Sequence, residues 1–216
     1  MNKRKEKYVP KAVILRMQKY HRYLKELINR DIPRVSSKQI ADFMGFTASQ
    51  VRQDLNYFGG FGQQGYGYNV EDLYGEIGKI LGLNKNYNIA IVGAGNLGTA
   101  LAHYNQFDRL GFKLVAIFDI SPRVIGSEIN GLEVSSMEDF ERKIDEMNVE
   151  IIYLCTNTEG AQAVADRICT TRARAIFNFV PTDLNVPEDM IVENTYIVDK
   201  LLAISYQLKA SKMAEK

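Results

Sequence analysis

The feature that most constrains the fold is an apolar strand pattern that runs into a glycine-rich turn. Residues 89–92 are apolar, and Gly93-x-Gly95-x-x-Gly98 follows directly and leads into a helical run from about Asn96. In such a motif the first glycine allows the tight turn, the second lets backbone approach a pyrophosphate, and the third lets helix and strand pack closely. The helix N-terminus then offers free N–H groups and a positive dipole end to the anion. We therefore expect a dinucleotide to bind at Gly93, Gly95, Asn96, Leu97 and Gly98.

An acidic residue in the next strand supports this interpretation. The apolar run 112–118 ends at Asp119, 21 residues after Gly98. A carboxylate there accepts a hydrogen bond from a ribose 2′-hydroxyl and repels a 2′-phosphate, so the pattern favours NAD as the cofactor. The alternative is a Rossmann-like fold that binds no dinucleotide.

Composition limits the class of protein. A chain of 216 residues suits one large or two small domains, and 46% hydrophobic residues are enough for a core. No apolar run approaches the roughly 18 residues of a membrane span, and the basic start has no apolar segment of a secretory signal after it. Cys155 and Cys169 form no disulfide framework, which is typical of a reducing compartment. We expect a cytoplasmic protein with no membrane partner.

The net charge of +1 hides an asymmetry along the chain. Residues 1–80 hold 14 Lys/Arg against 8 Asp/Glu and carry a charge of +6. Residues 81–216 hold 13 against 18 and carry −5. A basic first domain joined to an acidic second one indicates a polyanion as partner of the first.

The basic part is predicted to form three helices and a β-hairpin. Pro10 suits a first helical position, and an apolar stripe follows it at helical spacing: Val13, Met17, Tyr20, Leu24, Leu27 and Ile28. A second helix is capped by Ser36 or Ser37 and ends at Gly45, and a third covers about 48–58 with Thr47 as its N-cap. The glycines and aromatic residues of 59–70 predict a compact hairpin.

Two short helices joined by a tight turn after a longer helix are typical of a helix-turn-helix, and the hairpin would make it a winged helix. The third helix would enter the major groove of double-stranded DNA, where Arg, Gln and Asn pair with base edges. Five side chains are expected on its outer face: Ser49, Gln50, Arg52, Gln53 and Asn56. The alternative is a small helical domain for protein contacts.

The acidic part is predicted to alternate strands and helices. Strands are expected at 88–92, 112–118, 132–134, 150–155 and 173–179, with helices at 96–108, 137–147 and 160–171. This alternation predicts an α/β fold with a doubly wound parallel sheet. Residues 70–83 would form a linking helix, and a last amphipathic helix would run from Asp199 to about Met213. The predicted domains are 1–80 (winged-helix, DNA-binding), 84–198 (Rossmann, dinucleotide-binding) and 199–216 (C-terminal dimerisation helix).

The sequence offers little for catalysis. Its histidines are His21 and His103, and we find no paired carboxylates, metal-spaced Cys/His cluster or nucleophile elbow. We therefore expect no enzyme and no metal site, and interpret the dinucleotide as a signal. Cys155 ends a strand on the expected nicotinamide side, where it is either a thiol switch or a buried small side chain.

These features together resemble the Rex family of bacterial redox-sensing repressors over nearly the whole chain. In the first domain the matching segments are Pro10-x5-Arg16-x3-Tyr20, Ser36-Ser37-Lys38-Gln39-Ile40-Ala41, Val51-Arg52-x-Asp54-Leu55-x-Tyr57-Phe58-Gly59 and Gly65-Tyr66-Gly67-Tyr68. In the second they are Gly93-x-Gly95-Asn96-Leu97-Gly98-x-Ala100-x3-Tyr104, Phe118-Asp119, Ile125-Gly126, Ala161-Gln162-x-Val164-Ala165-Asp166 and Asn178-Phe179.

The resemblance implies a homodimer that exchanges its C-terminal helix, represses transcription at a palindromic operator and is released by NADH. Its two recognition helices would lie about 34 Å apart, one helical turn of DNA. A small rotation of the subunits would spoil that spacing. The resemblance implies signalling roles for Arg16 and Tyr104, with Tyr104 also near the cofactor. It adds Ser37, Lys38, Tyr57, Gln64 and Tyr66 to the DNA-binding residues.

Some positions depart from the family pattern. The aspartate position of the exchanged segment is occupied by Tyr196, and the position of the hydrophobic residue beside the nicotinamide is occupied by Ile197. Asp199, which follows Val198, resembles the family's Val-Asp pair but lies three residues beyond the expected position. Where the family has Thr-x-Pro after the fourth strand, this chain has Cys155-Thr156-Asn157. Two glycines that the family has around the fifth strand are Arg172 and Ala175 here. A basic residue of the recognition helix is Gln53, and the wing tip is Gln63-Gln64. We expect weak or altered operator binding and reduced discrimination between NADH and NAD⁺.

Other classes stay open from the sequence. One is a divergent paralogue with weakened DNA binding or redox response. Another is a small NAD-dependent oxidoreductase whose first domain dimerises. A third is a Rossmann module that binds CoA or a nucleotide.

Overall fold

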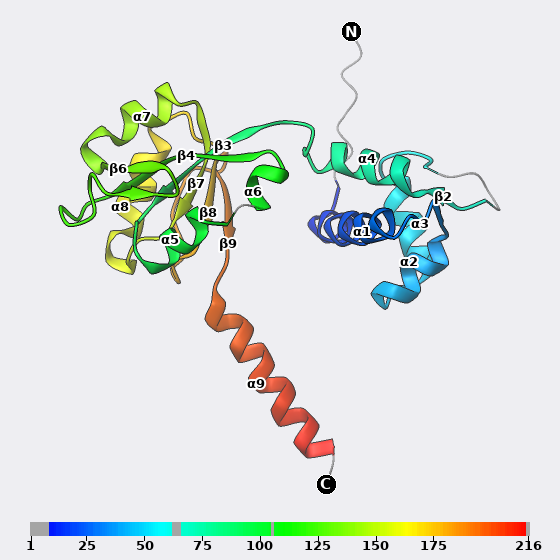
Figure 1. The fold of residues 1–216 in the computed structure, drawn as a ribbon. Coiled ribbons are helices and arrows are strands. Elements are labelled where there is room, and N and C mark those ends of the chain that lie inside the picture. Colours follow the sequence, from blue (N-terminus) through cyan, green and yellow to red (C-terminus); the bar gives the residue numbers. More distant parts are fainter. Residues whose placement is uncertain (1–8, 62–65, 105, 215–216) are drawn as a thin grey trace. The chain divides into compact units, whose positions relative to one another are not determined.

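The computed structural model describes residues 9–61, 66–104 and 106–214, and the chain divides into two compact units, Met1–Lys85 and Asn86–Lys216 (Figure 1). Each unit has its own hydrophobic core.

The first unit is built from helices around a short pair of strands. Its elements are α1 (Lys11–Asn29), β1 (Arg34–Val35), α2 (Ser37–Met44), α3 (Ala48–Asn56), β2 (Tyr68–Asn69) and α4 (Val70–Ile80). The apolar stripe of α1 is buried as predicted, from Val13 to Leu27, and Ile28 packs half-buried against it. Val51 and Leu55 of α3 close the same core.

Local capping chemistry explains where α2 and α3 begin. Ser36, not Ser37, caps α2: its Oγ accepts from the Gln39 N–H at 3.1 Å, and its N–H donates to Gln39 Oε1 at 2.8 Å. Gly45 ends α2 with φ +69, and Thr47 Oγ1 accepts from the Gln50 N–H at 3.2 Å to start α3. Each such N-cap stabilises its helix by about 1 kcal/mol.

Several expectations for the first unit are wrong in detail. Pro10 is the N-cap of α1 and not its first helical residue, because its ψ of 139° is extended. The helix at 70–83 is shorter, ends at Ile80 and is no mere linker, because Val70, Leu73 and Ile77 lie in the core of the unit. The expected hairpin within 59–70 does not form among the described residues of that range. Instead β2 pairs antiparallel with β1, which lies before α2.

The second unit contains a sheet of seven strands within its described residues. They are β3 (Tyr87–Val92), β4 (Phe112–Asp119), β5 (Glu128–Ile129), β6 (Leu132–Ser136), β7 (Val149–Leu154), β8 (Ala175–Asn178) and β9 (Ile191–Asn194). The order is β5-β6-β4-β3-β7-β8-β9, and only β5 runs antiparallel to its neighbour. Leaving out β5, this is the strand order of a Rossmann fold, with β3 at the centre.

Helices cover both faces of this sheet. They are α5 (Asn96–Ala102), α6 (Gln106–Arg109), the 3₁₀ turn η1 (Met137–Asp139), α7 (Phe140–Glu146) and α8 (Thr158–Cys169), and α9 (Ile197–Ala214) follows β9. Phe140, Ile144 and Ile168 fill the core under α7 and α8. Ile89 and Ile117 belong to the core on the other face.

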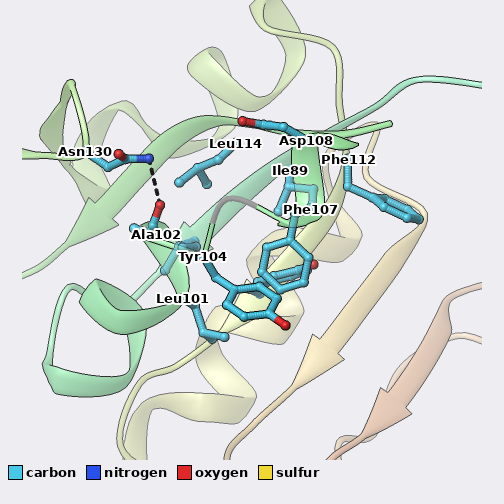
Figure 2. A pocket seen from close by; sticks show the side chains of 11 residues that line it. Ile89, Leu101, Ala102, Tyr104, Phe107, Asp108, Phe112, Leu114 and Asn130 are labelled. Carbon is cyan, nitrogen blue, oxygen red and sulfur yellow. Dashed lines mark hydrogen bonds between the residues drawn. The ribbon is translucent and has the colours of Figure 1, made fainter. Parts of the chain in front are cut away.

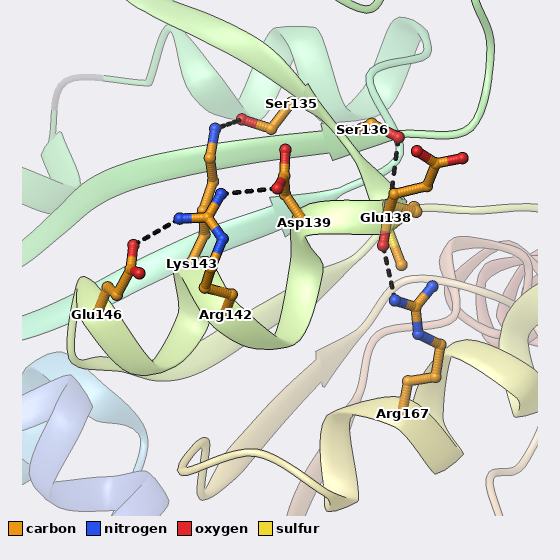
Figure 3. Close-up of polar contacts among 9 residues, drawn as sticks. Ser135, Ser136, Glu138, Asp139, Arg142, Lys143, Glu146 and Arg167 are labelled. Atoms are coloured by element: carbon orange, nitrogen blue, oxygen red, sulfur yellow. Dashed lines mark hydrogen bonds and ion pairs between the residues drawn. The ribbon is translucent and has the colours of Figure 1, made fainter.

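Polar contacts fix the outer side of α7 (Figure 3). Arg142 donates to Asp139 at 2.6 Å and to Glu146 at 2.8 Å, and Lys143 donates to Ser135 Oγ at 2.7 Å. Arg167 of α8 donates to the Met137 carbonyl at 2.6 Å. These contacts join α7 to η1 and β6, and α8 to η1.

The helix expected over 96–108 is broken. It ends at Ala102, whose carbonyl accepts from Asn130 Nδ2 at 2.8 Å, and a short α6 follows. The Asn130 amide takes the place of the backbone N–H that would bond to the Ala102 carbonyl if the helix continued. Because Asn130 lies far along the chain, the sequence of the helix could not reveal this end. The two-residue strand β5 was also missed, because two residues are too few for a strand pattern.

The last helix, α9, begins at Ile197, two residues earlier than expected. Its side chains are exposed throughout 197–212, including Leu201, Leu202, Ile204 and Leu208. Within the described residues, no helix is both long and apolar enough to span a membrane.

Candidate functional site

The glycine-rich loop lies at the centre of the sheet. The Gly93 N–H donates to the Phe118 carbonyl of β4 at 2.8 Å, and the Cys155 N–H donates to the Val92 carbonyl at 2.8 Å. The loop therefore follows β3 between the carboxyl ends of β4 and β7. In an open α/β sheet this is the switch point at which ligands bind.

The three glycines of the motif have different surroundings. Gly93 has φ +105, and a Cβ there would lie 2.5 Å from the Cys155 carbonyl oxygen. A Cβ at Gly98 would lie 1.9 Å from the Gly93 carbonyl oxygen. A Cβ at Gly95 would meet no protein atom within 4 Å. The protein's own packing thus requires Gly93 and Gly98, while the absence of a side chain at Gly95 leaves open space beside the N-terminus of α5.

Asp119 is held beside this loop at the end of β4. One carboxylate oxygen accepts from the Ala94 N–H at 2.7 Å, and the other accepts from the Ser121 N–H at 2.8 Å. A carboxylate has about four lone-pair sites, so two bonds leave room for a ribose hydroxyl. The open cradle at Gly95 and this fixed acid fit the pyrophosphate and ribose of a dinucleotide. The cofactor roles of Asn96 and Leu97, in the first turn of α5, stay predictions.

Cys155 follows β7 and is half-buried. Burial raises the pKa of its thiol to about 12. Since the thiolate is the reactive form, this environment favours the interpretation as a packed small side chain over that of a thiol switch. Its neighbour Asn157 caps α8 by accepting from the Gly160 N–H at 2.9 Å.

Tyr104 lies in the break between α5 and α6, at the edge of a small pocket (Figure 2). Its ring contacts Phe107 edge-on at 4.9 Å between centroids, and Phe107 contacts Tyr153 of β7 at 5.5 Å. Asp108 and Asn130 supply polar groups to the pocket. Tyr104 itself is 48% exposed, so it is accessible to a ligand or to another chain.

The segment before α9 is tied to its own unit. The Tyr196 hydroxyl lies 2.9 Å from the Thr182 carbonyl oxygen and 3.0 Å from Asp183 Oδ1. Ile197 and Asp199 are exposed in the first turn of α9. The expected signalling roles of Tyr196 and Asp199, and the cofactor contact of Ile197, stay predictions.

The outer face of α3 carries polar side chains. Ser49, Arg52, Gln53 and Asn56 are exposed, as expected for readers of base edges. Gln50 differs from the expectation that it faces outward: it is half-buried, and its Nε2 donates to Asp54 Oδ1 at 2.9 Å.

Other predicted DNA contacts flank this face. Arg52 Nη1 donates to Ser37 Oγ at 3.0 Å and so links α3 to the start of α2, where Lys38 is exposed. Tyr57 is half-buried at the end of α3. Tyr66 is 71% exposed, and its carbonyl accepts from Arg34 at 3.2 Å. Gln63 and Gln64 lie outside the described residues.

A buried charge that the sequence did not single out joins α3 to α1. Asp54 is fully buried and accepts from Arg16, Tyr20 and Gln50. Arg16, predicted as a signalling residue, therefore contacts α3, the helix expected to read the DNA. The signal was present in the spacing, because Asp54 shares the inner face of α3 with Val51 and Leu55.

The described residues contain no group of three or more His, Cys, Asp or Glu side chains that could hold a metal.

Comparisons with known proteins decide the family. Residues 8–56 match a family described as putative DNA-binding protein N-terminus, and residues 84–182 match one described as CoA binding domain. The redox-sensing transcriptional repressor Rex of Caldanaerobacter subterraneus subsp. tengcongensis is 51% identical over 98% of this chain and 95% of its own. That of Clostridioides difficile is 52% identical over 95% of this chain and 98% of its own. The chain belongs to the Rex family.

Solved structures agree with this membership. The structure of RSP in complex with β-NAD⁺ and operator DNA matches with a TM-score of 0.92 and 50% identity, covering 97% of this chain and 96% of that one. RSP in complex with β-NADH matches with a TM-score of 0.89 and 47% identity, covering 97% and 98%. The resemblance and the fold class read from the sequence are confirmed. Rex proteins are transcriptional regulators rather than enzymes, which rules against the oxidoreductase alternative.

Proposed function

We propose that this Rex protein represses transcription by binding operator DNA as a homodimer and is released from the DNA by NADH. The observation that carries the proposal is the open space at Gly95, beside the fixed carboxylate of Asp119, in a chain whose first unit exposes a polar helix-turn-helix face. RSP, its relative, has been solved with β-NAD⁺ and operator DNA and with β-NADH.

The NAD(H) site in this proposal is the crevice at the end of β3. Gly95 and the free N–H groups of Asn96 and Leu97 receive the pyrophosphate, since a helix N-terminus stabilises an anion. Asp119 accepts from the adenosine ribose. Cys155 and Tyr104 lie towards the nicotinamide, and Ile197 contacts it from the segment that begins α9.

The DNA site in this proposal is the outer face of α3. Ser49, Gln53 and Asn56 point away from the core and reach base edges in the major groove. Arg52 and Lys38 carry positive charge to the phosphates, which position the protein without reading sequence. Ser37, Tyr57, Tyr66 and Gln64 complete the interface at its borders.

The homodimer in this proposal is formed by α9. Its exposed apolar side chains include a stripe at helical spacing, Ile197, Leu201, Ile204 and Leu208, but Val198, Leu202 and Tyr206 are exposed outside that stripe, so α9 is apolar around most of its circumference and not amphipathic as expected from the sequence. Exposed stripes of this kind mark protein–protein contacts. We assign residues 1–80 to DNA binding, 84–198 to the dinucleotide and 199–216 to dimerisation, and place the protein in the cytoplasm, where it meets operator DNA.

The test is operator binding with and without each dinucleotide. A palindromic operator is selected from a random DNA library, and fluorescence anisotropy measures its affinity for the full chain. NADH is expected to weaken binding at least tenfold and NAD⁺ at the same concentration less, with the difference between them narrowed by the departures from the family pattern at Tyr196 and Ile197. If NADH and NAD⁺ change the operator affinity equally, the protein is a dinucleotide-binding paralogue without a redox response. An absence of any selected DNA would refute repression.

A further inference from the structure

The recognition helix is joined to α1 by one fully buried carboxylate. Asp54 accepts from Arg16 twice, with Nε–Oδ2 at 2.6 Å and Nη2–Oδ1 at 2.7 Å. The Tyr20 hydroxyl donates to Oδ2 at 2.7 Å, and Gln50 Nε2 donates to Oδ1 at 2.9 Å. The four bonds come from both helices and match the acceptor capacity of a carboxylate.

The charge of Asp54 depends on these partners. Burial by itself raises the pKa of this carboxyl, but the hydrogen bonds from Arg16, Tyr20 and Gln50 outweigh burial and lower the pKa below its usual value. Asp54 is therefore ionised and can only accept. A buried carboxylate that loses its guanidinium becomes an uncompensated charge, so the pair is expected to form and break as a unit.

The geometry of the pair controls a degree of freedom that the apolar core leaves loose. Val51 and Leu55 bury α3, but apolar contacts are non-directional. A fork-to-fork guanidinium–carboxylate pair is planar and directional. Asp54 thus fixes how far α3 is rotated about its own axis relative to α1. That rotation decides which side chains of α3 face outward.

We propose that Asp54 is a positioning residue for operator recognition, which sets the rotation of α3 through Arg16 and Tyr20 and thereby aims Ser49, Gln53 and Asn56 at the base edges. The inference rests on the proposed operator binding. Gln50 is half-buried and donates one amide N–H to Asp54, so in this proposal it acts through Asp54 rather than by reading a base. The Arg16 side chain is 22% exposed while that of Asp54 is wholly buried, so Arg16 is the accessible end of the pair.

The test compares two variants of the full chain that remove the same charge. Asp54→Asn removes the buried carboxylate, and Asp42→Asn removes an exposed one on α2. Anisotropy measures binding to the selected operator and to a scrambled duplex of equal length and composition. Asp42→Asn is expected to bind both DNAs equally well or slightly more tightly, since a negative charge is lost. Asp54→Asn is expected to bind the operator at least tenfold more weakly and the scrambled duplex within twofold of the parent.

Milder variants keep the inference testable if Asp54→Asn does not fold, as judged by circular dichroism. Tyr20→Phe and Gln50→Met each remove one donor and leave the Arg16–Asp54 pair in place. Each is expected to lower the ratio of operator to scrambled affinity about threefold. Gln50→Met is expected to reduce the affinity for all operators with a single substituted base pair by the same factor. Loss of a side chain that reads a base would instead relax the base preference at one position only.

The outcomes separate the two claims. If the parent does not distinguish operator from scrambled DNA, the proposed function fails. If the parent does distinguish them, the variants decide the positioning role. That role is wrong if Asp54→Asn, or Tyr20→Phe and Gln50→Met where Asp54→Asn does not fold, keep the parent's ratio of operator to scrambled affinity. It is also wrong if they bind both DNAs more weakly by the same factor. Relaxed preference at one base pair in Gln50→Met would make Gln50 a base reader.

Discussion

Replacing Gly95 by alanine tests whether the open space in the glycine-rich loop receives the dinucleotide. Gly95 has φ −74 and ψ −169, which alanine adopts without strain, and its new Cβ would meet no protein atom within 4 Å. The free energy of unfolding is therefore expected to stay unchanged or to rise by about 0.4–1 kcal/mol, because alanine restricts the unfolded chain. The affinity for NADH is expected to fall at least tenfold, about 1.4 kcal/mol, since the methyl group occupies the place of the pyrophosphate.

Gly98→Ala is the matched control with the opposite profile. Its Cβ would lie 1.9 Å from the Gly93 carbonyl oxygen, so backbone must move. Overpacking of this kind costs about 1–3 kcal/mol, which exceeds the gain of roughly 1 kcal/mol from alanine in a helix. Gly98→Ala is expected to lose stability first and affinity as a consequence.

Urea denaturation measures the stability of both variants, and titration calorimetry measures NADH binding. Calorimetry is the suitable method because the chain has no tryptophan to report on NADH. A Gly95→Ala variant that is stable and binds NADH as tightly as the parent would refute the assignment of this space. Asp119→Ala distinguishes NADH from CoA as the ligand, because the substitution is expected to weaken the binding of NADH but to leave the binding of a CoA-type ligand unchanged.

Three further predictions concern charge and protonation. Gln64→Arg is expected to tighten operator binding, because the arginine adds one phosphate contact. The slope of the logarithm of the binding constant against the logarithm of the salt concentration should then steepen by about 0.9. Binding measured over a salt series checks this, and an unchanged affinity would contradict it. Cys155, whose pKa is raised to about 12 by burial, is expected to react with iodoacetamide at pH 8 only after denaturation, as followed by mass spectrometry; rapid labelling of the native protein would restore the thiol switch. His21 stacks on Tyr74 at 4.1 Å, and burial, with Lys25 nearby, lowers its pKa below 6.5. The unfolded chain then takes up a proton that the folded chain refuses, so the free energy of unfolding is expected to fall as pH drops below about 6.5. In His21→Gln this decline should be reduced, and an equal slope would exclude His21 as its source.

Features that depend on a few neighbouring residues could be read from the sequence. The N-cap of α2, narrowed to Ser36 or Ser37, the helix-ending glycine Gly45 and the N-cap Thr47 each act over one helical turn. The glycine-rich loop and the acid at Asp119 follow from the spacing of a strand, a turn and a strand. The apolar stripe of α1 follows from helical periodicity. These local rules were sufficient for the fold class and for the family resemblance.

Features that depend on partners far along the chain required the tertiary structure. Asp54 looked like one more polar residue of α3, but its guanidinium partner lies 38 positions earlier, and together they turn Gln50 inward. Asn130 ends α5 from 28 positions away, and β2 pairs with a strand that precedes two helices. A pattern of residue types determines which elements form, because periodicity, caps and turns act between residues a few positions apart. Which buried polar group meets which donor is decided only when those elements pack, because the partners are then brought together from distant parts of the sequence.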